Sequence, residues 1–265
     1  MVEKDGERSG IMDEIVVRFI GRKPSLRNPI LIEGLPGIGN VGKLAIEHLI
    51  ESIGAKKFVE IYSKNFPPQV FINPDGTIKL VNNELYYWKA KSKKQKDLIL
   101  LTGDYQGLSS DGQYELADSI LKIARDYNVK QIFTLGGYGL GREVKEPNVL
   151  GAATSKKLVN KMKRYGVVFR ENEPGGGIIG ASGLLLGLGK LYGMEGVCLM
   201  GETPGYLVDP KSAKAVLVVL SKILNIEVDL TELERKAKEI ELIAQQLRSL
   251  EEGLRKSKED LSYIG

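Results

Sequence analysis

The chain of 265 residues is 42% hydrophobic and 27% charged, a composition that can bury the core of one large domain, with or without an appendage. Its 38 basic and 34 acidic residues leave a net charge of +4, which gives no reason to expect a nucleic-acid or membrane partner. The single cysteine, Cys198, and the single histidine, His48, exclude an internal disulfide and a zinc site of Cys and His ligands, and they predict a reducing, cytoplasmic setting.

The first half of the chain predicts strands, one helix and a hairpin. A polar arm at 1–10 lacks the apolar run of a secretory leader, strands are expected at 14–21, 28–34 and 58–63, and a helix is expected at 40–53. Pro-Asp-Gly inside 69–90 is a turn between two β-rich runs, so this stretch predicts a hairpin or a small meander. The basic run at 90–97 is interpreted as a solvent-exposed turn.

The second half alternates strands with helices. Strands are expected at 97–104, at 130–141 and from 196, each passing into a glycine-rich loop, and helices are expected at 114–127, 148–166 and 209–226. The last of these helices begins with Asp209-Pro210, which suit the cap and the first turn. The alternation predicts an α/β core at 1–228, with a layered, largely parallel sheet flanked by helices.

Glycine-rich loops follow four of the expected strands, at 34–42, 103–107, 136–141 and 201–205. Parallel strands bring such loops together at the carboxyl edge of the sheet, where ligands usually bind. Polar groups would gather at the same edge, namely Thr102, Asp104, Tyr138, Glu202 and Thr203. A ligand crevice fits this pattern, and so does a set of tight turns that simply need glycine.

The loop GIGNVGK, from Gly37 to Lys43, matches two phosphate-binding motifs incompletely. A P-loop needs a Ser or Thr after the lysine to bind magnesium, and Leu44 stands there instead. A dinucleotide loop needs an acid at the end of the next strand, and Glu60 lies in the middle of that strand. A third explanation is a tight strand-to-helix turn with close packing. A ligand site at this edge would use Gly37, Gly39, Gly42, Lys43, Asp104, Tyr138 and Glu202.

Residues 229–265 differ in character from the core and predict a long C-terminal helical segment. Apolar side chains recur every three or four positions, and Asp229 or Thr231 can cap the start. A seam of about 45 Å is longer than one small patch of the core can cover. The helix could pack back onto its own domain or contact other copies, and its wide apolar face favours contacts between copies in a homo-oligomer. The seam consists of Leu233, Ala237, Ile240, Ala244, Leu247 and Leu254.

Four motifs, in this order, carry a resemblance to a known family. They are EGLPGIGNVGKLAIEHLI, LTGDYQG, TLGGYGLG and GIIGASGLLLGLGKLYGMEGVCLMGETPGYLVDPKSA. Together they resemble the archaeal proteasome-assembly-chaperone family over roughly residues 12–245. The resemblance implies an α/β core, homo-oligomers and a chaperone or scaffold rather than an enzyme. Such proteins have sometimes been labelled ATP-grasp-like, but no lysine, acid and glycine loop of this chain assemble a nucleotide site, so no cofactor is expected.

The resemblance also implies a use for the end of the chain. Proteasome-binding proteins often end in a hydrophobic residue, a tyrosine and any residue, whereas this chain ends Ser262-Tyr263-Ile264-Gly265. The tyrosine is third from the end, so contact with proteasome subunits and contact with another protein complex both stay open. We expect several copies of a contact made by Leu261, Tyr263 and Ile264. The rival expectation is a nucleotide- or small-molecule-binding enzyme that uses the glycine loops.

Overall fold

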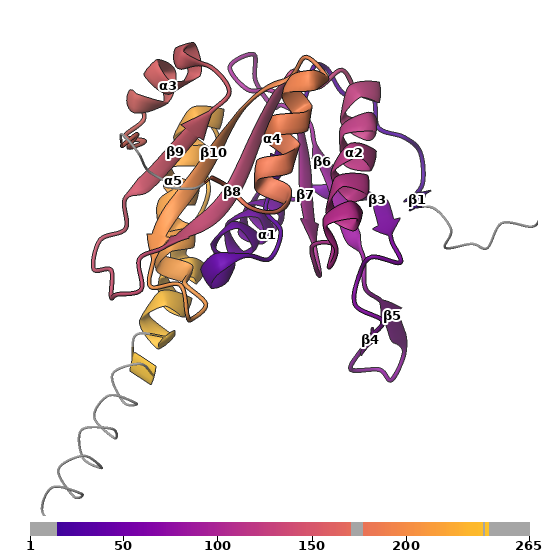
Figure 1. Ribbon diagram of the computed structural model, residues 1–265, viewed down its shortest axis with the longest axis horizontal. Helices are drawn as coiled ribbons and strands as arrows, with labels where there is room; N and C mark the ends of the chain where they lie inside the picture. The colour runs from indigo at the N-terminus through magenta and orange to yellow at the C-terminus, as the bar shows by residue number, and fades with distance from the viewer. Residues whose placement is uncertain (1–14, 171–176, 241, 244–265) are drawn as a thin grey trace, which may run out of the picture.

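The computed structural model describes residues 15–170, 177–240 and 242–243, and its centre is an eight-stranded sheet covered by helices on both faces (Figure 1). The strand order is β1-β3-β6-β7-β2-β8-β10-β9. The strands are β1 (Val16–Phe19), β2 (Ile30–Glu33), β3 (Lys56–Tyr62), β6 (Asn83–Trp88), β7 (Leu98–Gly103), β8 (Gln131–Gly139), β9 (Val149–Ala153) and β10 (Glu195–Thr203).

The four central strands run parallel to one another, and the strands outside them pair antiparallel. The parallel centre of β7, β2, β8 and β10 is rich in apolar residues because both of its faces are buried. This arrangement confirms the predicted α/β class and layered sheet, with the parallel pairing confined to the centre. The carboxyl ends of the four strands meet along one border of the sheet, called the carboxyl edge below, and the opposite border is the amino edge.

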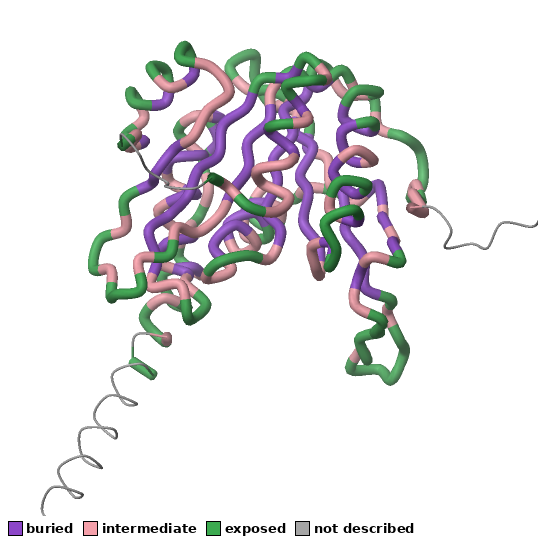
Figure 2. The backbone as a smooth tube through the Cα atoms, in the orientation of Figure 1, coloured by how far each residue is buried: buried purple, intermediate pink, exposed green. Residues whose placement is uncertain are grey.

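Helices α1 (Val41–Ile53) and α5 (Pro210–Leu224) cover one face of the sheet, and α2 (Ser110–Asp126) and α4 (Ala181–Leu191) cover the other. Each pair buries an apolar core against the strands, which are buried along most of their length in Figure 2. The predicted start of α5 is confirmed, because Asp209 accepts a hydrogen bond from the backbone N–H of Ser212. A short 3-10 turn, η1 (Ile38–Asn40), precedes α1, and α3 (Lys156–Lys163) lies beside β9.

The predicted hairpin is confirmed as a separate two-stranded sheet of β4 (Val70–Ile72) and β5 (Ile78–Leu80). Its turn is closed by Asp75, whose carboxylate accepts hydrogen bonds from the backbone N–H and the hydroxyl of Thr77. The remainder of that stretch becomes β6 of the main sheet. The hairpin projects away from the body of the molecule and is exposed over most of its length (Figures 1 and 2).

The prediction of a helix at 148–166 is wrong for the first part of that range. The structure has strand β9 there, and α3 begins only at Lys156. β9 pairs antiparallel with β10, and a Cβ on Gly151 would lie 2.5 Å from the side chain of Val167. The local sequence VLGAA has no strong preference for a strand, so pairing with β10 and close packing decided its conformation.

Candidate functional site

The carboxyl edge contains a crevice where the chain leaves neighbouring strands for opposite faces of the sheet. After β2 the chain enters α1 on one face, whereas after β7 it enters α2 on the other. Parallel sheets bind ligands at such points because the two loops separate there. The crevice has a volume of about 620 Å³ and is lined in part by Gly136 and Gly137, which continue β8 instead of forming the expected loop.

Only part of the ligand site that the sequence suggested lies at this crevice. Gly37 and Tyr138 are lining residues. The other five do not line it, namely Gly39, Gly42, Lys43, Asp104 and Glu202. The structure therefore does not bring the lysine and the acids together around one cavity, as a nucleotide site would need.

Lys43 and Asp104 are engaged with partners inside the chain. The Nζ atom of Lys43 donates a hydrogen bond to the carbonyl oxygen of Gly103 at 2.8 Å. The carboxylate of Asp104 accepts a hydrogen bond from the backbone N–H of Asn82 and lies 3.5 Å from the Nζ atom of Lys79. These contacts tie the end of β7 to α1 and to the segment before β6, so both charges hold the carboxyl edge together.

Glu202 is buried near the end of β10 and holds the neighbouring segments in place. Its carboxylate accepts a hydrogen bond from the side-chain amide of Asn148 at 2.8 Å and pairs with Arg170 at 2.7 Å. Burial acts to raise the pKa of Glu202, but the hydrogen bonds from Asn148 and Arg170 outweigh it and hold the pKa below its usual value. Glu202 is therefore an ionised anchor rather than a group suited to proton transfer at neutral pH.

The glycines of GIGNVGK serve close packing between α1 and the sheet. A Cβ on Gly42 would lie 2.1 Å from the carbonyl oxygen of Leu135 in β8. Gly39 has a φ of +61°, and a Cβ there would lie 2.9 Å from Oγ1 of Thr203. The protein's own atoms therefore fill the space beside these glycines, which supports the structural explanation of the motif.

The buried acid that sequence analysis missed is Glu33, the last residue of β2. One of its carboxylate oxygens accepts a hydrogen bond from the backbone N–H of Leu35 at 2.8 Å, and the other from the hydroxyl of Ser182 in the first turn of α4 at 2.9 Å. Burial raises the pKa of Glu33 to about 7, although both hydrogen bonds act to lower it. The available signal was an acid closing the otherwise apolar strand ILIE.

Glu33 should make the stability of the fold depend on pH. An acid whose pKa is about 7 in the folded chain, against 4.5 in the unfolded chain, holds its proton more tightly when folded. Its contribution is fully present below pH 4.5 and is lost as the pH rises through 7, a change of about 3 kcal/mol. We expect Glu33→Gln, which keeps both hydrogen-bonding positions, to unfold at a higher temperature than the parent at pH 8 and to lose this advantage at pH 4. Parallel pH profiles for the two proteins would contradict a titrating Glu33.

Several polar side chains around the crevice are already hydrogen-bonded within the chain. Gln106 donates a hydrogen bond to the carbonyl of Pro36 and accepts one from the backbone N–H of Ala181. Burial raises the pKa of the lining thiol of Cys198 to about 12, so the thiol is protonated at neutral pH and is a poor nucleophile. The described lining contains no charged side chain, so no lysine or arginine there would neutralise the phosphates of a nucleotide.

Large apolar side chains are exposed along the carboxyl edge. On the hairpin they are Val70, Phe71, Ile72, Ile78 and Leu80, of which Ile72 is 78% exposed. In the loop after β10 they are Tyr206, Leu207 and Val208. Single exposed apolar residues are ordinary, but several along one border of a domain mark an interaction surface. We call these eight residues the apolar rim. The sequence predicts the hairpin but not the exposure of its apolar side chains.

The helical stretch 231–240 is anchored to the core before it reaches the carboxyl edge. Leu233 is 1% exposed within the core cluster of α1 and α5, and Lys214 of α5 pairs with Glu234 at 2.7 Å. Leu233 packs in its own chain, which corrects its expected place in a seam between copies. Ala237 and Ile240 are half-buried beside the loop after β10, so their role in such a seam stays a prediction.

The remaining positions of the predicted C-terminal sites lie outside the described residues. They are Ala244, Leu247, Leu254, Leu261, Tyr263 and Ile264, and both their roles and the division at residue 228 stay predictions. Within the described ranges, no helix has the length and apolar character needed to cross a membrane. The same ranges contain no group of three or more His, Cys, Asp or Glu side chains placed to hold a metal ion.

Sequence comparison places relatives along nearly the whole chain. A sequence model of the PAC2 family matches residues 31–248. An uncharacterized protein of Methanocaldococcus jannaschii is 45% identical over 261 residues, covering 96% of this chain and 99% of that protein. A second uncharacterized protein of the same organism is 30% identical over 239 residues, covering 89% of this chain and 91% of that protein. None of these matches supports an ATP-grasp-like label.

Two solved structures from Pyrococcus furiosus share the fold. PbaB, described as an archaeal proteasome activator, is 45% identical with a TM-score of 0.85, over 89% of this chain and 100% of that chain. PbaA, described as an archaeal homolog of proteasome-assembly chaperone, is 28% identical with a TM-score of 0.71, over 93% of this chain and 96% of that chain. The fold, including its mixed sheet, is therefore that of solved PAC2-type structures.

Proposed function

Because this chain belongs to the PAC2 family, we propose that it is a non-enzymatic assembly chaperone or scaffold that acts as a homo-oligomer on a protein complex in the cytoplasm, with the proteasome as the first candidate. Two similarities support the choice of complex. PbaB is described as a proteasome activator and PbaA as a homolog of a proteasome-assembly chaperone. Both are similar to this chain over most of its length.

The observation that carries the proposal is the apolar rim. Its residues in the loop after β10 lie beside the described part of the C-terminal helical segment, and its hairpin residues lie at the other end of the same edge (Figure 1). The hairpin β4–β5 and the described part of that segment project from the same side of the sheet (Figure 1). A complex that contacts the C-terminal segment therefore meets exposed apolar side chains at the same edge. Burying such side chains is the main favourable contribution in most protein–protein association.

The proposed mechanism is multivalent display. Each copy presents one C-terminal segment with Leu261, Tyr263 and Ile264, and a homo-oligomer presents several at once. Once one segment is bound, the others are held at a high local concentration near their own sites, so weak contacts combine into strong binding when the geometry fits. Ala237 and Ile240 are the described residues that we assign to contacts between copies.

Native mass spectrometry of the full chain, alone and mixed with an archaeal 20S proteasome, tests this function. We expect a defined homo-oligomer with the mass of the polypeptide alone, and a complex with the proteasome. The proposal would be overturned by a monomer or dimer that carries an extra mass the size of a nucleotide and forms no complex with the proteasome. That outcome would favour the rival enzyme.

A further inference from the structure

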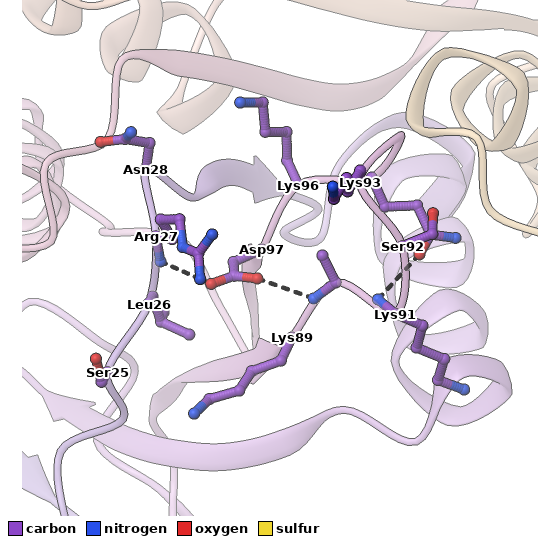
Figure 3. Close-up of a pocket in the computed structure, with 12 residues that line it drawn as sticks. Ser25, Leu26, Arg27, Asn28, Lys89, Lys91, Ser92, Lys93, Lys96 and Asp97 are labelled. Atoms are coloured by element: carbon purple, nitrogen blue, oxygen red, sulfur yellow. Dashed lines mark hydrogen bonds between the residues drawn. The ribbon is translucent and has the colours of Figure 1, made fainter.

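A second surface lies at the amino edge of the sheet, at the border opposite the apolar rim. There the turn between β6 and β7 and the segment before β2 enclose a hollow of about 820 Å³ (Figure 3). Five cations line it, namely Arg27, Lys89, Lys91, Lys93 and Lys96. Among the described residues, none of these five charged groups has an ion pair or hydrogen-bond partner. The cations are therefore available to a ligand.

Positive charge is dense around this hollow. With the adjacent Lys94, six cations and the single acid Asp97 leave a charge of +5, whereas the whole chain carries only +4. The rest of the chain has a net charge of −1, but it includes a second cluster of exposed cations on α3 and the residue that follows it, at 156–164. A concave surface with one sign of charge raises the local concentration of oppositely charged ligands.

Hydrogen bonds brace the wall of the hollow. The carboxylate of Asp97 accepts one from the backbone N–H of Arg27 at 2.6 Å and one from that of Ala90 at 2.8 Å, which joins the two segments (Figure 3). The side chain of Gln95 accepts a hydrogen bond from the backbone N–H of Lys91 and donates one to the residue that caps α5. The turn is solvent-exposed, as its sequence predicts, but it is also held in one conformation.

An adjoining hollow extends the surface into a groove. The second hollow has a volume of about 880 Å³ and shares Lys91 and Gln95 with the first. Its other lining residues include the apolar side chains Ile53, Trp88 and Val228. The same hollow is also lined by the charged residues Lys222 and Glu227 and by Ser52 and Asn225. The groove therefore runs from a cationic hollow into a largely polar one, which suits an extended, acidic segment of protein.

A phosphate-bearing ligand fits this hollow less well. The backbone N–H groups of Arg27, Ala90 and Lys91 would help to cradle a phosphate, but they already donate to Asp97 and Gln95. The lysine ammonium groups are separate point charges on flexible stems, so they can meet carboxylates that are spaced along an extended peptide. No aromatic side chain is among the described residues that line the 820 Å³ hollow, and Trp88 of the adjoining hollow is only 6% exposed, so a nucleic-acid base would find little surface on which to stack.

We propose that the amino-edge hollow binds an acidic segment, rich in Asp and Glu, of a protein partner. The contact goes beyond the proposed function, because it uses the border opposite the apolar rim and none of the residues assigned to the C-terminal segment. A partner held there leaves the carboxyl edge of the same chain free for the complex.

Fluorescence anisotropy of a labelled octaglutamate peptide with the full chain tests this site. We expect binding that weakens as salt is added, because the attraction is electrostatic. Lys91→Gln/Lys93→Gln should weaken binding about tenfold, since two favourable charge contacts are lost. The control Lys156→Gln/Lys157→Gln removes the same charge from two exposed lysines of α3 and should bind like the parent.

Three outcomes would overturn the inference. The parent could fail to bind octaglutamate at low salt, or the two double variants could lose affinity equally, which would mean that net charge rather than the hollow attracts the peptide. Stronger displacement by tripolyphosphate or by oligothymidylate than by unlabelled octaglutamate would assign the hollow to phosphate ligands instead. The assay contains this protein and the peptide but no proteasome. Its result is therefore independent of the proposed function, in which the chain binds the proteasome.

Discussion

Gly42→Ala is expected to destabilise the fold by about 3 kcal/mol. The added methyl carbon would lie 2.1 Å from the carbonyl oxygen of Leu135, where ordinary contacts begin near 3.4 Å. This oxygen belongs to the backbone of the central strand β8. It cannot move aside as the end of a flexible side chain could, so α1 must shift away from the sheet. For a domain of this size, the melting temperature should fall by roughly 6 to 12 °C in thermal unfolding.

Gly187→Ala is the matched control for this prediction. Gly187 is exposed on α4, and a Cβ there meets no atom within 4 Å. The substitution should stabilise the protein by about 0.5 to 1 kcal/mol, because alanine is the better helix former. Since Gly42 also lies in a helix, the difference between the two variants isolates the clash with β8. If Gly42→Ala were as stable as the parent, close packing would not be the reason for this glycine.

Deleting residues 259–265 is expected to weaken binding to the proteasome by a factor of about 10² to 10⁴, because all displayed copies of the contact are lost together. The last fully buried residue that the structure describes is Leu233, so the described core does not depend on the deleted stretch. The melting temperature and the native mass of the homo-oligomer should stay unchanged. Surface plasmon resonance on immobilised 20S proteasome would measure the loss.

A deletion of residues 1–10 is the control for the truncation. It removes a polar segment of similar length from the other end of the chain and should leave binding intact. Within the tail, Tyr263→Ala should lose more affinity than Ser262→Ala if the aromatic side chain makes the contact. The assignment of the tail would have to be abandoned if the truncated protein bound the proteasome as tightly as the parent does.

The candidate site was only partly predictable from the sequence. The glycine loops indicated the carboxyl edge correctly, because glycines after strands are a local pattern, and Gly37 and Tyr138 do line the crevice there. The sequence did not indicate Glu33, because the partner that hydrogen-bonds its buried carboxylate, Ser182, lies 149 positions away. The motif alone made Lys43 a candidate ligand-binding residue. Only the tertiary structure shows that its ammonium group is hydrogen-bonded to the carbonyl oxygen of Gly103.

Local patterns in this sequence determined the α/β class, the order of most strands and helices, the hairpin and the start of α5. Periodicity, caps and turn residues act over a few positions, so they can be read without knowing the fold. The family resemblance also came from the order of motifs along the chain.

Tertiary structure decided the rest, because those features depend on residues that are distant in the sequence. Pairing with β10 made VLGAA a strand, and contact with Leu135 made Gly42 a packing residue. Leu233 is buried against the apolar surface of α1 and α5 in its own chain, and not in the predicted seam between copies. The lysine run lines a hollow because Asp97 accepts a hydrogen bond from the backbone N–H of Arg27, which lies 70 positions earlier in the chain.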